Sequence, residues 1–222
     1  MVSKWIERMK VVGQSTIAIP AEAQADPIGA KLDWSPIESG GTNIRTHRLV
    51  IENPQTAVFV PTALAKAFYS LFMAIGLGLS GTMIYNHTVN QAWSFNMITL
   101  VPILIGLIFA AFGGYMFFFG TRPCTFDKRA GYFWKGQTRP TDHFNPDELE
   151  DVARLEEIHA LQLIREYIPG DRQSRGYYSY ELNLVLTSGD RVNIVDHGNL
   201  RKLRADAEKL AKFLEKPLWA AV

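Results

Sequence analysis

Two apolar runs determine the fold of this chain: AFYSLFMAIGLGLSGTMI at residues 67–84 and MITLVPILIGLIFAAFGGYMFFF at residues 97–119. Over the whole region 53–126, only Lys66 and Arg122 carry a charge. As helices, the runs would span roughly 27 Å and roughly 34 Å, against a hydrocarbon core of about 30 Å. Together they predict a membrane hairpin rather than buried helices of a soluble domain.

The backbone of both runs must be helical, because lipid offers no partner to its N–H and C=O groups. We predict helices at about 64–85 and 96–120 within a hairpin of residues 61–121. Small residues recur four apart, which lets two helices approach closely. They are Ala74, Gly78 and Gly76, Ser80 in the first run and Gly106, Ala110, Gly114 in the second. They predict the helix contact, although glycine and alanine are also simply common in membrane helices.

Basic residues predict which side of the membrane the flanks face. The connection NHTVNQAWSF at 86–95 contains no lysine or arginine. Both outer flanks carry several: Arg48 and Lys66 before the hairpin, and Arg122, Lys128, Arg129 and Lys135 after it. Because positively charged flanks stay in the cytoplasm, we predict that both termini are cytoplasmic.

Composition narrows the class of partner. The 23 basic and 22 acidic residues leave no excess positive charge to recruit nucleic acid, so no nucleic-acid partner is expected. Cys124 is the single cysteine, which excludes an internal disulfide framework or a thiolate metal cluster. The histidines lack the paired spacings of a zinc or iron site; they are His47, His87, His143, His159 and His197. We predict no metal and no cofactor.

The remaining residues form an arm and two pieces of one β-domain. Residues 1–44 read as an irregular arm, with a short helix around Trp5, Ile6 and Met9. The β-domain comprises 45–60 and 122–222. Its predicted strands are 45–52, 55–60, 123–127, 132–136, 158–167, 177–187 and 190–195. The segment 158–167, IHALQLIREY, fits helix and strand about equally.

Alternation in 177–187 predicts a strand with one wetter face. A short helix is predicted to begin at Asn145, where a capping residue precedes a proline and two acids. The last helix has an apolar stripe of Leu200, Leu203, Ala207, Leu210 and Leu214. Asp196, His197 and Asn199 are predicted to satisfy free N–H groups at its start. Pro217 ends the helix, and Leu218 and Trp219 are predicted to pack on the core.

The predicted fold class is membrane α+β. A two-stranded ribbon is marginal alone, so the strands before the hairpin must pair with those after it. The hairpin is then an insertion in a small antiparallel β-barrel or sandwich, closed by a C-terminal amphipathic helix. This layout of seven strands and one terminal helix resembles the pleckstrin-homology-like fold.

A resemblance to a protein family points the same way. Residues 178–219, YSYELNLVLTSGDRVNIVDHGNLRKLRADAEKLAKFLEKPLW, with TFDKRAGYFWKG at 125–136, resemble poorly characterised bacterial two-helix inner-membrane proteins. The resemblance covers 34–222 loosely and 121–219 better. It implies a pleckstrin-homology-like cytoplasmic domain on a multi-pass anchor in the bacterial inner membrane, and it carries over no catalytic residues.

Catalysis is not expected. The most enzyme-like group is Asp196 and His197, with Ser179 or Ser188 nearby in sequence. Adjacent Asp and His side chains cannot easily orient one another, and no Gly-x-Ser-x-Gly elbow is present. A phosphate-binding loop is also missing from the sequence. We therefore predict that the protein is not an enzyme.

Several cations are candidates for binding lipid head groups: Arg122, Lys128, Arg129, Lys135, Arg201, Lys202 and Arg204. Basic residues beside a membrane gain about 1 kcal/mol each from anionic lipid. The simpler interpretation is that they only set the topology.

The main functional hypothesis is a membrane-anchored, non-enzymatic binding module that presents its cytoplasmic β-domain to a protein partner or to lipid head groups. The alternative is an immunity protein that neutralises a toxin acting at the inner membrane. Both functions need only an anchor and a binding surface.

Overall fold

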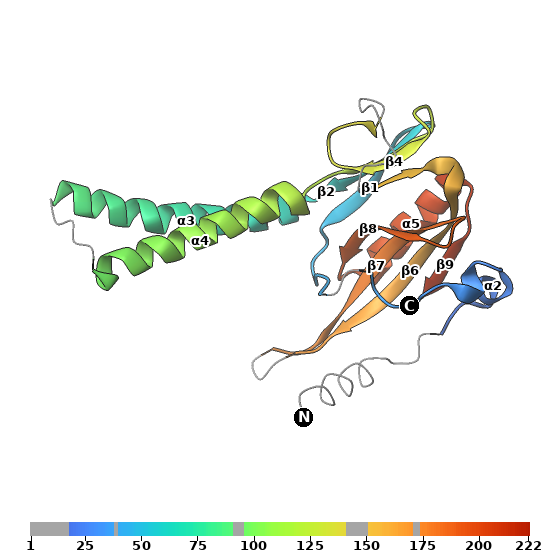
Figure 1. The fold of residues 1–222 in the computed structure, drawn as a ribbon, viewed down its shortest axis with the longest axis horizontal. Coiled ribbons are helices and arrows are strands. Elements are labelled where there is room, and N and C mark those ends of the chain that lie inside the picture. Colours follow the sequence, from blue (N-terminus) through green and yellow to red (C-terminus); the bar gives the residue numbers. More distant parts are fainter. Residues whose placement is uncertain (1–17, 38–39, 91–95, 141–150, 171–173) are drawn as a thin grey trace. The chain divides into compact units, whose positions relative to one another are not determined.

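The computed structural model of the protein describes residues 18–37, 40–90, 96–140, 151–170 and 174–222. The chain divides into two compact units (Figure 1). The helical unit is Pro61–Arg122, and the β-unit combines Met1–Val60 with Pro123–Val222. The β-unit is therefore built from chain on both sides of the helical unit.

The helical unit contains two long apolar helices, α3 (Ala63–Val89) and α4 (Met97–Gly120). Thr62 and Asn96 cap them, each accepting a backbone N–H with its side-chain oxygen. α3 continues one turn further than predicted. Both helices are long and apolar enough to cross a membrane, and only 11% and 22% of their most apolar windows are buried. The buried core helix of a soluble domain would show the opposite.

Small residues form the contact between α3 and α4. Gly76 lies against Gly106 and Ala110, and the hydroxyl of Ser80 donates to the Ile103 carbonyl at 2.9 Å. Of the two small-residue pairs predicted in α3, Gly76 with Ser80 therefore makes the contact.

Three residues of the predicted contact lie elsewhere. Ala74 is exposed, and a Cβ added at Gly78 or Gly114 would meet open space. Gly113 packs on α3 in place of Gly114, because seven residues from Gly106 return to nearly the same helix face and eight overshoot it by about 80°.

The β-unit contains two sheets. The first has the order β1-β2-β3-β4-β5, with β1 (His47–Asn53), β2 (Thr56–Pro61), β3 (Cys124–Asp127), β4 (Tyr132–Lys135) and β5 (Val152–Arg154). β2 and β3 pair antiparallel, with Phe59 opposite Cys124. Gly131 ends the β3–β4 turn at φ 78°, a conformation that favours glycine. β5 was not predicted, because three residues are too short to show alternation.

The second sheet has the order β8-β7-β6-β9. Its strands are β6 (Ile158–Ile168), β7 (Tyr177–Leu186), β8 (Arg191–His197) and β9 (Leu218–Ala221). The ambiguous segment 158–167 is a strand, since β6 is paired on both sides. β6 and β7 run antiparallel, whereas β6 and β9 run parallel. β9 follows the last helix, α5 (Leu200–Leu214). For this segment the sequence had predicted packing on the core but no strand.

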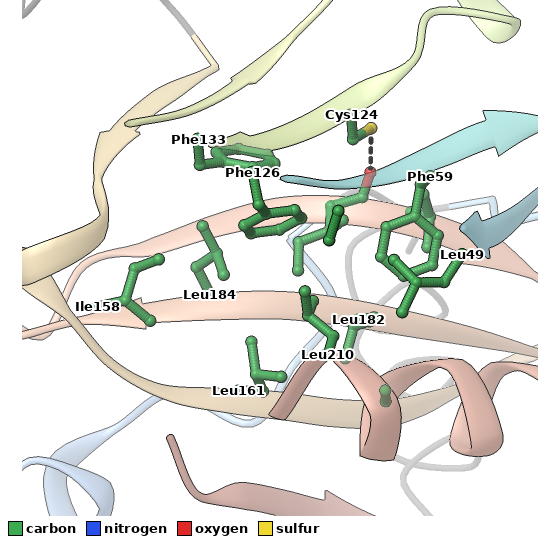
Figure 2. Packing of buried hydrophobic residues seen from close by; sticks show 14 of the residues in the cluster. Leu49, Phe59, Cys124, Phe126, Phe133, Ile158, Leu161, Leu182, Leu184 and Leu210 are labelled. Carbon is green, nitrogen blue, oxygen red and sulfur yellow. Dashed lines mark hydrogen bonds between the residues drawn. The ribbon is translucent and has the colours of Figure 1, made fainter. Parts of the chain in front are cut away.

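The main core lies between the two sheets and α5. Figure 2 shows Phe126 and Phe133 of the first sheet facing Leu184 of the second. The predicted stripe of α5 is in this core, with Leu203 and Leu210 fully buried. In the described part of the chain the strands form two separate sheets. The barrel alternative is therefore wrong, and the β-unit is a layered structure of antiparallel sheets with one parallel pair.

The described part of the arm contains two short helical elements and packs against the second sheet. Residues 21–25 form helix α2 (Ala21–Ala25), followed by a 3-10 turn, η1 (Gly29–Lys31). Trp34 is buried in a second apolar cluster with Ile164 and Trp219. The arm thus covers the face of the second sheet that points away from the main core. The helices predicted around Trp5 and from Asn145 lie outside the described residues.

Candidate functional site

Chain connectivity marks one end of the β-unit. The chain leaves this unit after β2, which ends at Pro61, and returns at Pro123 before β3. Because Phe59 and Cys124 are paired neighbours, both crossings lie at the same end of the first sheet. We call this end the tether end.

The second sheet and α5 share the tether end. The Cys124 thiol donates to the carbonyl of Ile194 at 3.2 Å, which places the middle of β8 beside the start of β3. β8 then continues to His197, and α5 begins at Leu200. The first turns of α5 therefore lie at the tether end, and its last turn lies at the opposite end.

The structure separates the seven candidate cations into groups. Arg201, Lys202 and Arg204 are exposed on the first turns of α5, at the tether end. Arg122 belongs to the helical unit, two residues beyond α4, with its guanidinium 4.3 Å from the centre of the Phe119 ring. Four of the seven therefore lie close in sequence or space to the crossings between the units.

The other three candidates lie elsewhere or have internal partners. Lys128 and Arg129 stand in the β3–β4 turn, at the opposite end, where the Lys128 ammonium lies 4.6 Å from the centre of the Phe213 ring. Lys135 donates to the Asn193 side chain at 3.1 Å and is mostly buried. A surface that binds head groups at the tether end would not include them.

At the start of α5, basic side chains lie next to the positive end of the helix dipole. Its first turn has no acidic residue, although an N-terminus carries about half a positive charge from the aligned peptide dipoles. Arg201 and Lys202 add two cations in that first turn, and Arg204 follows in the next turn. Each such placement costs roughly 0.3–1 kcal/mol, which an external anion would offset.

The predicted network at the start of α5 involves two of its three residues. Asn199 is the N-cap and accepts the Lys202 N–H at 3.1 Å. His197 Nδ1 accepts the Asn199 N–H at 3.2 Å. The Asp196 side chain accepts from the Asn193 side chain at 3.0 Å.

His197 is a fully buried histidine close to other charges. Burial, followed by the nearby charges of Arg45 and His47, lowers its pKa from the usual 6.5 to about 4. Arg45 in turn forms an ion pair with Asp206 of α5. His197 Nε2 has no hydrogen-bond partner among the described residues. The ring is therefore neutral at physiological pH and part of the core.

The buried His197 predicts a pH dependence of stability. Its pKa is lower in the folded than in the unfolded state, so its contribution is complete above pH 6.5 and is lost as the pH falls towards 4. We expect this group to remove on the order of 3 kcal/mol from the unfolding free energy. Urea unfolding of the detergent-solubilised protein, followed by tryptophan fluorescence, measures the loss. In His197→Asn the loss between neutral and acid pH should be smaller; an identical loss in both proteins would contradict the assignment.

A buried polar face lies between β7 and the arm. The alternation in 177–187 had been interpreted as a strand with a wetter face, yet Ser179, Glu181 and Asn183 are at most 3% exposed. The Glu181 carboxylate accepts the backbone N–H of Ile37 at 3.0 Å. Sequence reasoning missed this cluster because the segment that covers it is distant in the chain.

A longer chain of polar contacts fixes the arm to the second sheet. Gln162, also buried, donates to the Asp33 carbonyl at 3.1 Å. Arg191 donates to the Ser35 carbonyl at 2.7 Å and to Gln162 at 3.1 Å. Through these contacts, the polar face of the second sheet holds the arm in place.

The enzyme-like residues are used structurally. Ser179 donates to the Thr42 carbonyl at 3.2 Å, and Ser188 donates to Asp190 at 2.8 Å. The two serines lie at opposite ends of β7. Over the described residues, no group of three or more His, Cys, Asp or Glu side chains could hold a metal ion.

No family model, curated protein or solved structure matches this chain. At the tether end of the β-unit, the exposed cations of α5 lie close to the buried His197.

Proposed function

We propose that the protein is a membrane-anchored, non-enzymatic binding module whose β-unit engages anionic lipid head groups at its tether end. The observation that carries the proposal is the exposed cluster of Arg201, Lys202 and Arg204 at that end. If α3 and α4 cross the bilayer, the tether end stays near its surface, because few residues separate the strands from the helices.

The distribution of charge supports a cytoplasmic β-unit in the bacterial inner membrane. The connection between α3 and α4 has no lysine or arginine, whereas Lys66 and Arg122 stand just outside the two apolar runs. The cytoplasmic leaflet is rich in anionic lipid, which attracts basic residues within about 10 Å at moderate salt. The cations of α5 thus have the sign that this surface requires.

Energy transfer to labelled lipid tests the proposal on the full chain. A dye on Ala205→Cys, an exposed site beside the three cations, reports the distance to acceptor lipids in proteoliposomes. Burial raises the pKa of the Cys124 thiol to about 12, so a maleimide labels only the introduced cysteine. We expect transfer to rise when anionic lipid replaces neutral lipid and to fall again at about 1 M salt.

A charge-reversed variant and a control on the same helix sharpen the test. R201E/K202E/R204E should lose the response to anionic lipid, while K209E/K212E/K216E, with the same change in charge near the other end of α5, should keep most of it. Equal transfer in neutral and anionic membranes would contradict head-group binding. Labelling of residue 205 in intact cells by an impermeant maleimide would contradict the cytoplasmic orientation.

A further inference from the structure

The hairpin between β6 and β7 carries exposed aromatic side chains at its tip. Tyr167 and Tyr178 are direct partners across the two strands, with ring centroids 5.2 Å apart, and they are 42% and 43% exposed. The guanidinium of Arg165 lies 5.7 Å from the centre of the Tyr178 ring. We call Arg165, Tyr167 and Tyr178 the tyrosine patch.

The patch lies at the tether end. His197 at the end of β8 pairs with Tyr180 of β7, and Tyr178 lies two residues further along β7 in the same direction. Alternation along the strands places Tyr167 and Tyr178 on the same face as the core residues Leu163 and Leu182. The patch therefore lies on the face of the second sheet that carries the core, past the point where α5 begins.

The arm stiffens the other face of this hairpin. Glu166 accepts the Gly40 N–H at 3.2 Å, and the Tyr177 hydroxyl donates to the Gly41 carbonyl at 2.8 Å. Ser179 makes a similar contact with Thr42. One face of the tip is thus held by hydrogen bonds, while the tyrosine patch is presented on the other.

The chemistry of the patch suits a lipid–water interface. Tyrosine combines an apolar ring with a polar hydroxyl, and arginine can place its charge among phosphates while its stem lies on apolar surface. Such residues are enriched where proteins meet the head-group region. Arg175 is exposed at the same end of the hairpin and lies outside the patch.

We infer that the tyrosine patch is a second membrane contact, which inserts into the head-group layer of an anionic bilayer and fixes the orientation of the β-unit. This inference rests on the proposed function. If the two helices cross the bilayer, a tyrosine pair at the same end of the β-unit as the cations of α5 provides a separate point of contact.

Fluorescence quenching by lipid measures the contact. A bimane label on Arg175→Cys in the full chain, reconstituted in anionic membranes, should be quenched by lipids that carry a nitroxide near the head group. The same label on Ser188→Cys, in the turn at the other end of β7, should not be quenched. Equal quenching at the two positions would overturn the inference.

Substitution of the patch separates lipid contact from a structural role. Tyr167→Ser with Tyr178→Ser should reduce quenching at residue 175 to the level at residue 188, and the pair Tyr167→Trp and Tyr178→Trp should retain it, since tryptophan suits the interface equally. Unchanged tryptophan fluorescence of the serine variant verifies its fold. Full quenching in the serine variant would overturn the role of the tyrosines.

The outcomes also distinguish this inference from the proposed function. A response to anionic lipid at residue 205 without quenching at residue 175 would leave the proposed function standing and refute the tyrosine contact. Shielding of residue 175 from iodide in native membranes, but not in pure lipid, would assign the patch to a protein partner and refute the lipid inference. Loss of both signals would refute both.

Discussion

Replacing Gly106 by isoleucine is expected to separate α3 from α4. A Cβ at this position would lie 2.8 Å from the Gly76 carbonyl oxygen and 2.9 Å from the Ser80 nitrogen, which are backbone atoms that cannot rotate away. The larger side chain would also displace Ser80 from its hydrogen bond to Ile103. We expect a loss of about 3 kcal/mol, the upper part of the range for overpacking, because the helix axes must move apart.

Disulfide cross-linking of a facing pair measures this separation. Phe72 and Phe109 stack across the helix contact with ring centroids 6.1 Å apart, so cysteines at these positions face one another and should cross-link under mild oxidation as the helices fluctuate. Gly106→Ile should slow the reaction at least about tenfold, as a loss of about 1.4 kcal/mol or more implies. Gly114→Ile is the matched control, since a Cβ there meets open space. Equal cross-linking in the two variants would show that small residues do not determine the contact.

The two long helices could be identified from composition alone, because soluble domains rarely contain apolar runs of this length without a charged residue. The face through which they contact one another was predicted only in part, because the four-residue spacing occurs in two pairs in α3, Ala74 with Gly78 and Gly76 with Ser80. Of the four small residues predicted in α3, Gly76 and Ser80 face α4. The choice between the pairs depends on the partner helix rather than on either run alone.

In the β-unit, local patterns predicted local elements well and distant pairing poorly. Strands with clear alternation and the stripe of α5 appear at the predicted residues within one or two positions. β9 was missed because its four residues form a strand only by pairing with β6, which lies far earlier in the chain. The packing of the arm was not predicted for the same reason. Trp34 packs against Ile164 and Trp219, which are distant in the sequence.

The candidate site also depends on residues that are distant in the sequence. All seven cations could be identified from sequence, but only the fold separates the three on α5 at the tether end from Lys128 and Arg129 at the other end. Lys135 illustrates the point, because its side chain contacts Asn193, which lies 58 residues later in the chain and in the other sheet. Within the tyrosine patch, Tyr178 lay in the predicted alternating strand, whereas Arg165 and Tyr167 lay in the segment that fitted helix and strand about equally.

The largest effect expected in the β-unit follows from removing the carboxylate of Glu181. This group is 3% exposed and accepts hydrogen bonds from the Ile37 N–H and from the side chain of Asn183. Glu181→Leu would leave the buried Asn183 amide and the part-buried Ile37 N–H without this acceptor, at about 1–3 kcal/mol for a buried donor. Because Ile37 lies in the arm, we expect the arm to detach before the rest of the unit unfolds.

Trypsin digestion follows this detachment, since Lys31 and Arg45 flank the segment that contacts Glu181. Opening by about 3 kcal/mol corresponds to more than about a hundredfold increase in the cleavable population, so cleavage at these sites should accelerate by at least about tenfold in Glu181→Leu. Glu156→Leu is the matched control, because the Glu156 side chain is 78% exposed. Cleavage at the same rate in both variants would show that the arm is held by its apolar residues, with Trp34 rather than Glu181 as the main contact.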